Sequence, residues 1–135
     1  MEINENRLTQ NCFEWFNNNF CLKHHPFRGI CFHIPNEGQH KLVSIGVLPG
    51  VADICIVYMG KVAWFELKTP EGKRTQKKKN FENQKDFEIR VQQQGQNYYL
   101  CLSLEEFQQA VYKEWPELSP ARSHANPIFR EGYGG

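Results

Sequence analysis

The chain has 135 residues, of which 40% are apolar and 13% aromatic, and its net charge is +1 at neutral pH. This length and composition predict one folded domain with its own core and exclude a disordered chain. No apolar run approaches the roughly 20 residues needed to cross a bilayer, and Met1–Asn4 lack the basic start of a secretion signal. We therefore expect no membrane partner and a cytoplasmic protein.

The cysteines are scattered and form no C-x-x-C pair. They are Cys12, Cys21, Cys31, Cys55 and Cys101. Their odd number and irregular spacing favour reduced thiols in the core over a zinc site or a disulfide framework.

The first expected element is a helix that Asn4 caps and that runs to about Phe20, because apolar residues recur between them at helical spacing. On a helical wheel Glu5 projects into the middle of the apolar stripe, so it is the inward-facing acid. Its other interpretation is a first-turn glutamate favoured by the helix dipole. A loop and a short apolar strand over 30–34 follow.

Two successive strands are then expected to form a hairpin that turns at Gly60, with Asp53 opening the first strand and Glu66-Leu67-Lys68 closing the second. The strands span residues 53–59 and 62–68. A turn on Gly60 and the residue before it sets Asp53 opposite Glu66, whereas a turn one residue later sets it opposite Lys68. In both registers the three ionisable side chains share one face. The glycines of the preceding segment, Gly46–Gly50, let its backbone approach another element closely.

Facing carboxylates on neighbouring strands repel each other, so Asp53 and Glu66 invite a bridging cation. Two acids and a lysine are also what metal-dependent phosphodiester hydrolysis requires, and oxygen ligands suit Mg²⁺ or Mn²⁺ better than zinc. The alternative is a surface salt-bridge ladder of Asp53, Glu66 and Lys68 worth less than about 1 kcal/mol.

A turn over 69–72 and a run of basic residues are expected after the hairpin. The run consists of Lys73, Arg74, Lys77, Lys78 and Lys79. Basic side chains supply the sequence-independent part of nucleic-acid affinity, so their position after the carboxylates favours contact with DNA phosphates. The alternative is a solvated, flexible loop.

The last expected elements are a helix over 81–94, a strand over 97–103 and a helix over 104–115. Gln84 falls on the buried stripe of the first of these helices, where a polar residue must find a partner. Residues 116–135 are rich in proline and glycine and are expected to form a mobile tail. The order α-β-β-β-α-β-α predicts an α/β domain with a mixed central sheet flanked by helices.

The chain contains, in order, Asn36-Glu37-Gly38, Gly46-Val-Leu-Pro-Gly50-Val-Ala-Asp53, Trp64-Phe-Glu66-Leu-Lys68, Gly72-Lys73, Gln84, Phe87, Gly95 and Tyr98-Tyr99-Leu-Cys-Leu-Ser103. This string resembles the VRR-NUC domain of the PD-(D/E)xK nuclease superfamily, in the compact stand-alone form common in phages and bacteria. An acid followed by E-x-K occurs often by chance, but the whole ordered string is more specific. The resemblance covers residues 4–115 and implies a restriction-endonuclease-like core, with residues 1–115 as the nuclease domain.

The resemblance implies that Asp53 and Glu66 bind Mg²⁺ or Mn²⁺ and that the Leu67 carbonyl completes the metal shell. It implies that Lys68 orients or activates the attacking water and that Gln84 supports the site.

The sequence departs from the family pattern in three places. Ala52 replaces the usual proline before the aspartate, and Thr75–Asn80 lengthen the connection after the hairpin. The family's first-helix glutamate lies four residues before a glutamine. In this chain Asn6 lies four residues before Gln10. Glu5 lies one residue before Asn6 and is the candidate for a further metal ligand.

The expected function is that of a metal-dependent DNA endonuclease, selective for branched DNA such as four-way junctions, in a bacterial or phage-infected cell. A symmetric cut needs two sites, so we expect a homodimer. Apolar surface for it could come from Phe13, Tyr98, Tyr99, Tyr112 and Trp115, unless these rings lie in the monomer core. The alternatives are a catalytically silent nucleic-acid-binding module, a non-specific nuclease and a structural or regulatory interaction protein.

Overall fold

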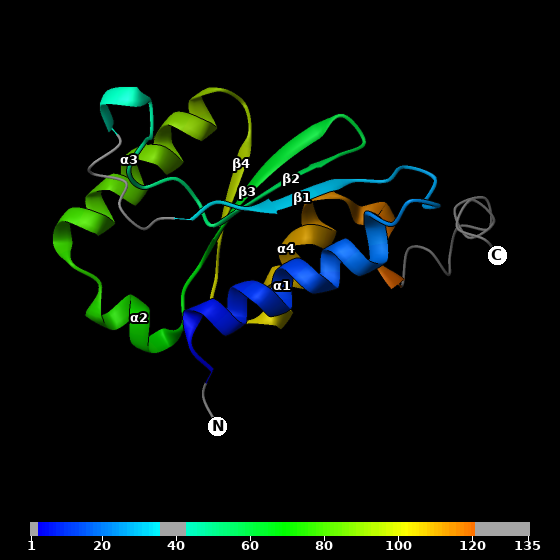
Figure 1. Ribbon diagram of the computed structural model, residues 1–135, viewed down its shortest axis with the longest axis horizontal. Coiled ribbons are helices and arrows are strands. Elements are labelled where there is room, and N and C mark those ends of the chain that lie inside the picture. The colour runs from blue at the N-terminus through cyan, green and yellow to red at the C-terminus, as the bar shows by residue number, and fades with distance from the viewer. Residues whose placement is uncertain (1–2, 36–42, 121–135) are drawn as a thin grey trace.

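The computed structural model describes residues 3–35 and 43–120, and its centre is a four-stranded sheet (Figure 1). The strands are β1 (Ile30–His33), β2 (Ile54–Tyr58), β3 (Lys61–Leu67) and β4 (Asn97–Cys101). They lie in the order β1-β2-β3-β4, with the first two pairs antiparallel and β3 parallel to β4. The predicted mixed sheet is therefore confirmed. The Asn36-Glu37-Gly38 motif lies outside the described residues.

Helices cover both faces of this sheet. They are α1 (Glu5–Phe20), α2 (Pro70–Thr75), α3 (Lys78–Gln93) and α4 (Leu104–Glu114), with short 3-10 helices η2 (Val43–Ile45) and η3 (Pro116–Leu118). Figure 1 shows α1 and α4 on one side of the sheet and α3 on the other. This arrangement confirms the mixed α/β class and adds α2 to the expected order.

Successive side chains along the hairpin strands point to opposite faces of the sheet, so the core and the site lie on different faces. Ile54, Ile56, Phe65 and Leu67 point to the face covered by α1 and α4, where all four are fully buried. The intervening side chains, including Asp53 and Glu66, point to the other face, part of which α3 covers with Phe87 and Val91. The expectation that the apolar face of the hairpin packs against a helix is confirmed.

The hairpin turn selects one of the two possible registers. Met59 and Gly60 both have positive φ angles, 50° and 78°, as the central residues of a type I′ turn do. Tyr58 then pairs with Lys61 and Ile54 with Phe65. Continuing this register by one residue sets Asp53 opposite Glu66, so the pairing of Asp53 with Lys68 is wrong.

The structure also corrects the expectation for residues 69–72. These residues begin α2: Thr69 is the N-cap, and its Oγ1 accepts a hydrogen bond from the Gly72 amide at 3.0 Å. Pro70 occupies the first turn, where its missing N–H costs nothing. The basic residues are exposed, as expected, but most of them lie on α2 and at the start of α3, so the run is not a loop.

The core extends further toward the C-terminus than expected. Pro116–Leu118 form η3, and Leu118 is 5% exposed and packs in the main core. The mobile tail therefore does not begin at residue 116, and residues 121–135 lie outside the described part of the chain.

The five aromatic residues that were expected to offer dimer surface pack within the monomer. Trp115 is fully buried, and Phe13, Tyr99 and Tyr112 pack against the main core. Tyr98 packs against the smaller cluster under α3. The monomer-core interpretation is favoured for these rings.

All five cysteines are unpaired, and Cys12, Cys55 and Cys101 are buried. This agrees with their interpretation as reduced core thiols. Within residues 3–35 and 43–120, no helix has the length and apolar character needed to cross a membrane.

Candidate active site

Asp53 and Glu66 meet at the end of the hairpin, on the face of the sheet that α3 borders. Their side chains are almost fully enclosed, with residue exposures of 9% and 1%. Asp53 Oδ2 accepts a hydrogen bond from the Leu67 amide at 2.8 Å, which holds the first strand's carboxylate against the end of the second. Because both acids are buried, their interpretation as a surface salt-bridge ladder is wrong.

The two carboxylates are strongly coupled. Burial, followed by the charge of Asp53, raises the pKa of Glu66 to about 9, although Lys68 opposes the rise. Burial also raises the pKa of Asp53, against the Leu67 amide and Lys68, which lower it. At neutral pH the pair therefore retains a proton in the absence of a cation. Glu66 Oε1 is buried, and no donor within the described residues reaches it.

Lys68 joins Glu5 to this pair. Lys68 Nζ lies 3.7 Å from Glu66 Oε2 and 3.7 Å from Glu5 Oε1, and its side chain is only 16% exposed. The inward orientation predicted for Glu5 is confirmed, although the residue also lies in the first turn of α1. Gly72 makes room for it, because a Cβ at that position would lie 2.6 Å from Glu5 Oε1.

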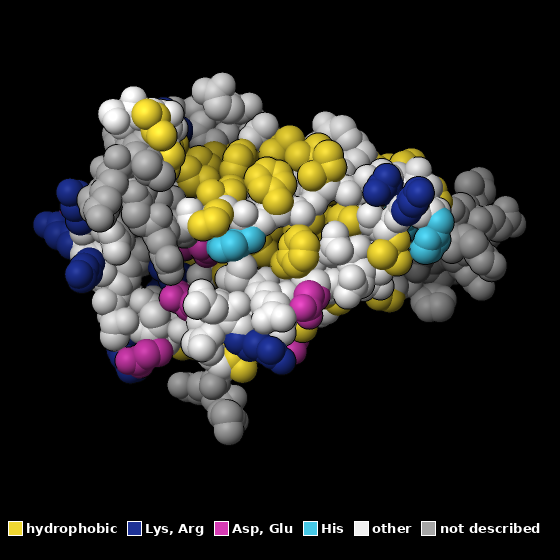
Figure 2. Space-filling view, viewed as in Figure 1, with side chains coloured by type: hydrophobic (Ala, Val, Ile, Leu, Met, Phe, Trp, Pro, Cys, Tyr) yellow, Lys and Arg dark blue, Asp and Glu magenta, His cyan; other side chains and the backbone are white. Residues whose placement is uncertain are grey.

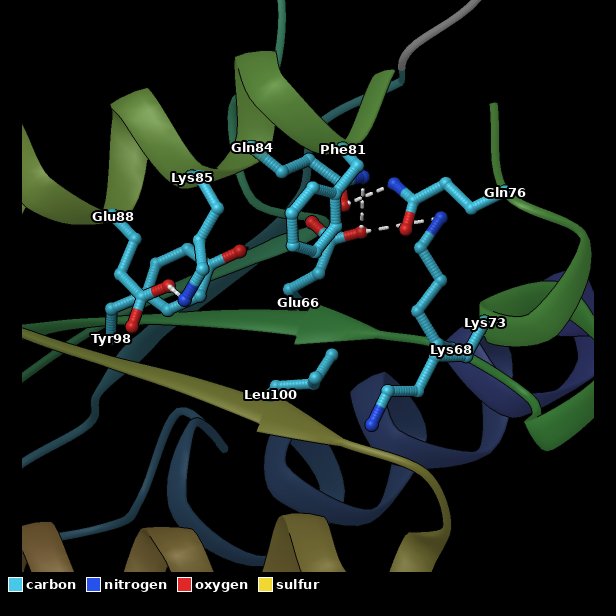
Figure 3. Close-up of a pocket in the computed structure, with 10 residues that line it drawn as sticks. All are labelled: Glu66, Lys68, Lys73, Gln76, Phe81, Gln84, Lys85, Glu88, Tyr98 and Leu100. Atoms are coloured by element: carbon cyan, nitrogen blue, oxygen red, sulfur yellow. Dashed lines mark hydrogen bonds and ion pairs between the residues drawn. The ribbon is translucent and has the colours of Figure 1, made fainter. Parts of the chain in front are cut away.

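Gln84 finds the partner that its position on a buried stripe requires. Its Nε2 donates to Glu66 Oε2 at 2.8 Å, and its Oε1 accepts from Gln76 Nε2 at 2.5 Å. This chain of hydrogen bonds fixes one oxygen of Glu66 from the side of α3 (Figure 3). Gln76 was not predicted. It lies in the short connection between α2 and α3, where no periodic pattern marks it.

His33 is a second neighbour that sequence reasoning missed. Its Nδ1 lies 2.9 Å from the Asp53 carbonyl oxygen, which also accepts from the Ile34 amide at 2.8 Å. Since a carbonyl can only accept, Nδ1 is the protonated nitrogen of this ring. These two donors fix the backbone of Asp53 where β1 ends.

The glycine-rich segment before Asp53 approaches α3 closely, as its composition predicted. Gly50 has a φ of +85°, and a Cβ there would lie 2.4 Å from the backbone of Asn83. A side chain at this position would therefore separate the segment from α3 at the residue directly before Gln84.

The basic residues lie beside the site on exposed surface. Figure 2 shows Lys and Arg side chains at the end of the molecule that α2 and the start of α3 form. Arg74 pairs with Glu71, and Lys78 lies 4.0 Å from Glu82. Lys73 also lines a pocket that runs along the sheet from Glu66 and Lys68 beneath α3 (Figure 3).

The donor set of the site suits a hard divalent cation. Two facing carboxylates, one with a buried oxygen that lacks a donor, supply the oxygen ligands that Mg²⁺ and Mn²⁺ prefer. The described part of the chain contains no cluster of three or more His, Cys, Asp or Glu side chains arranged to hold a metal. Glu5 reaches the pair only through Lys68, so its role as a ligand stays a prediction.

In comparisons with known proteins, no protein-family model, no curated protein and no solved structure matches the chain.

Proposed function

We propose that the protein is a metal-dependent DNA endonuclease built on a restriction-endonuclease-like core, as the resemblance to the VRR-NUC domain implies. The observation that carries this proposal is the enclosed pair of Asp53 and Glu66 beside Lys68, in which burial and the neighbouring carboxylate raise the pKa of Glu66 to about 9. Strongly perturbed acids in contact with a charge partner are typical of functional sites. A purely structural pair of carboxylates would be expected to have a donor for each oxygen.

In this proposal Asp53, Glu66 and the Leu67 carbonyl hold Mg²⁺ or Mn²⁺. When bound, the ion neutralises charge that develops on the scissile phosphate and lowers the pKa of water. Gln84 and Gln76 hold Glu66 Oε2 in one orientation, so the carboxylate loses little freedom on binding. Lys68 orients the attacking water, and Glu5 keeps the Lys68 ammonium directed at the site.

The basic residues of α2 and α3 supply the expected DNA contact. These residues are exposed beside the carboxylates: Lys73 and Arg74 on α2, Lys77 at the N-cap of α3, and Lys78 and Lys79 in its first turn. A duplex or junction that contacts them places its backbone near the opening that Lys73 shares with Glu66. The preference for branched DNA follows from the resemblance.

The homodimer is also part of this proposal, but the exposed apolar surface that supports it lies on β1 and not on the five aromatic residues expected from the sequence. Ile30 and Phe32 of β1 are 56% and 43% exposed, and they share a sheet face with Val57. Figure 2 shows hydrophobic side chains gathered over the sheet. Light scattering of the wild type and of Phe32→Glu tests this part: we expect a dimer for the first and a monomer for the second. A monomeric wild type would contradict it.

The central test is nicking of supercoiled plasmid with Mg²⁺, Mn²⁺ or EDTA. We expect cleavage with either ion and none with EDTA, and faster cleavage of a four-way junction than of a linear duplex. Binding without cleavage would favour the catalytically silent nucleic-acid-binding module. Equal cleavage of the junction and the linear duplex would favour a non-specific nuclease. Neither binding nor cleavage would favour an interaction protein.

Metal binding has a second readout that does not depend on cleavage. Mn²⁺ should raise the melting temperature of the wild type, because it binds Asp53 and Glu66 in the folded protein, where it replaces the proton that the pair otherwise holds. The same titration should leave Glu66→Gln unchanged. An equal shift in both proteins would place the ion elsewhere.

A further inference from the structure

The pocket beside Glu66 has a composition that metal binding alone does not explain. It is a small cleft of about 60 Å³ that opens to solvent. One end is formed by Glu66 and Lys68 and the other by Glu88 and Tyr98, so it extends well beyond the carboxylate pair (Figure 3).

Three large hydrophobic side chains line this pocket. Phe81 projects from the first turn of α3, while Tyr98 and Leu100 project from β4 on the opposite side (Figure 3). Phe81 is 50% exposed and Leu100 is 46% exposed. Tyr98 is half-buried, with its ring 6.2 Å from that of Phe87. The pocket therefore has an exposed aromatic ring on the side of α3 and apolar surface from Tyr98 and Leu100 on the side of the sheet.

The charges around the pocket define what can enter. Lys73 and Lys68 lie at the end near the carboxylates, and Lys85 lies further along, 3.2 Å from Glu88. Lys68 is already paired with Glu66 and Glu5. Lys73 is therefore the cation at the near end that favours a ligand with negative charge next to the site and an apolar, planar part deeper in the pocket. A nucleotide has this distribution of charge.

We infer that this pocket receives an unpaired nucleobase of the DNA strand whose backbone lies at Glu66 and Lys68. The inference rests on the proposed function and specifies its substrate: a strand with at least one unstacked base next to the scissile phosphate. A base that remains paired in a duplex cannot enter a space bounded by a helix on one side and by the sheet on the other. The ring of Phe81 supplies the stacking surface, and Lys73 meets the phosphate.

The experiment compares binding of an oligothymidine with binding of a blunt duplex, both in EDTA so that cleavage cannot interfere. Phe81→Ala should weaken oligothymidine binding about tenfold, as expected for the loss of one stacked base, and leave duplex binding unchanged. Ile89→Ala is the matched control, because Ile89 lies on the same helix, is 52% exposed and does not line the pocket. It should bind both ligands as the wild type does.

Two further variants separate stacking from a general apolar contact. Phe81→Trp keeps an aromatic face and should retain affinity, whereas Phe81→Leu keeps apolar bulk and should lose about as much as Phe81→Ala. An oligothymidine with abasic sites should reduce wild-type affinity to the level of Phe81→Ala. Wild-type affinity in Phe81→Ala, or an equal loss on the duplex, would overturn the inference.

This outcome is independent of the test of the proposed function. Plasmid cleavage that persists in Glu66→Gln would contradict the nuclease site and leave the binding comparison intact. Normal metal-dependent cleavage by the wild type, together with unchanged oligothymidine binding by Phe81→Ala, would contradict only the base pocket.

Discussion

Glu66 and Glu114 are both buried glutamates, with exposures of 1% and 4%, yet their surroundings differ completely. Glu66 faces another carboxylate, and burial raises its pKa to about 9. Glu114 lies near the other end of the sheet, where Lys61 Nζ is 3.0 Å from its Oε2. At neutral pH Glu66 keeps a proton beside Asp53, whereas Glu114 is an ionised carboxylate paired with a lysine.

The surroundings of Glu114 are those of a structural ion pair. Its Oε1 accepts from Asn97 Nδ2 at 2.8 Å and from the Tyr99 hydroxyl at 2.7 Å. Burial raises the pKa of Glu114, but the hydrogen bonds from Tyr99, Asn97 and Lys61 outweigh it and lower the pKa. Both oxygens thus have donors, whereas Glu66 Oε1 has none within the described residues. The comparison indicates that Glu114 stabilises the folded protein and that Glu66 lowers its stability.

The largest expected effect is on cleavage. Asp53→Ala, Glu66→Ala and Lys68→Ala should each reduce metal-dependent nicking about a thousandfold or more, because each removes a group placed at the reacting phosphate. Glu114→Gln is the control and should cut at close to the wild-type rate. Wild-type turnover in any of the first three variants would break the assignment of Asp53, Glu66 and Lys68.

Stability should show the opposite pattern. Glu114→Ala leaves the donors of Tyr99, Asn97 and Lys61 without their acceptor, and we expect it to lower the free energy of unfolding by about 2–4 kcal/mol. Glu66→Gln should leave this free energy unchanged or raise it, because glutamine is uncharged beside Asp53 without having to bind a proton. Urea unfolding in EDTA measures both. A destabilisation by Glu66→Gln as large as that by Glu114→Ala would remove the distinction between the two acids.

The pH dependence of stability should separate the two glutamates by sign. Between pH 4.5 and about 9 the folded protein holds a proton at Glu66 that the unfolded chain releases. The free energy of unfolding in EDTA should therefore fall as pH rises through this window. Glu66→Gln should flatten this fall, and saturating Mn²⁺ should oppose it.

Glu114 should act on the acid side. Its lowered pKa contributes stability above the ordinary glutamate pKa, and this is lost as pH falls through the folded-state value. Glu114→Gln should therefore reduce the loss of stability in acid without changing the alkaline side. Urea titrations from acid to alkaline pH test both signs, and a stability that rises toward pH 9 in EDTA would contradict the account of Glu66.

The sequence identified much of this site because local rules determine it. Alternation placed Asp53, Glu66 and Lys68 on one face in either register, and the buried stripe of α3 required a partner for Gln84. The choice of register depended on the positive φ angles of Met59 and Gly60, which the sequence alone left open.

The other features of the fold and the site could not be predicted, because they depend on tertiary contacts or on sequence signals that fit two structures. Thr69 is an N-cap and Pro70 a first-turn proline, and both are helix signals. The four residues 69–72 together, however, have the composition of a turn. Gln76 and His33 contact the site across separate elements, so no spacing in the chain reveals them. Only the fold brings Phe81 and Leu100 to one pocket.

The smallest expected effect concerns exposed charges that belong to neither glutamate. Replacing Lys77, Lys78 and Lys79 together with glutamine should weaken duplex binding about tenfold at moderate salt and leave the Mn²⁺-induced rise in melting temperature unchanged. Each lost phosphate contact should reduce the slope of log affinity against log salt by about 0.9. A double variant, Lys23→Gln with Lys113→Gln, removes exposed charge just after α1 and from the last turn of α4. The C-terminal ends of these helices lie far from α2 in Figure 1, so this variant should change the slope little. If the slope changed equally per removed charge in the two variants, DNA binding would depend on net charge alone. The basic residues of α2 and α3 would then have no specific role in DNA contact.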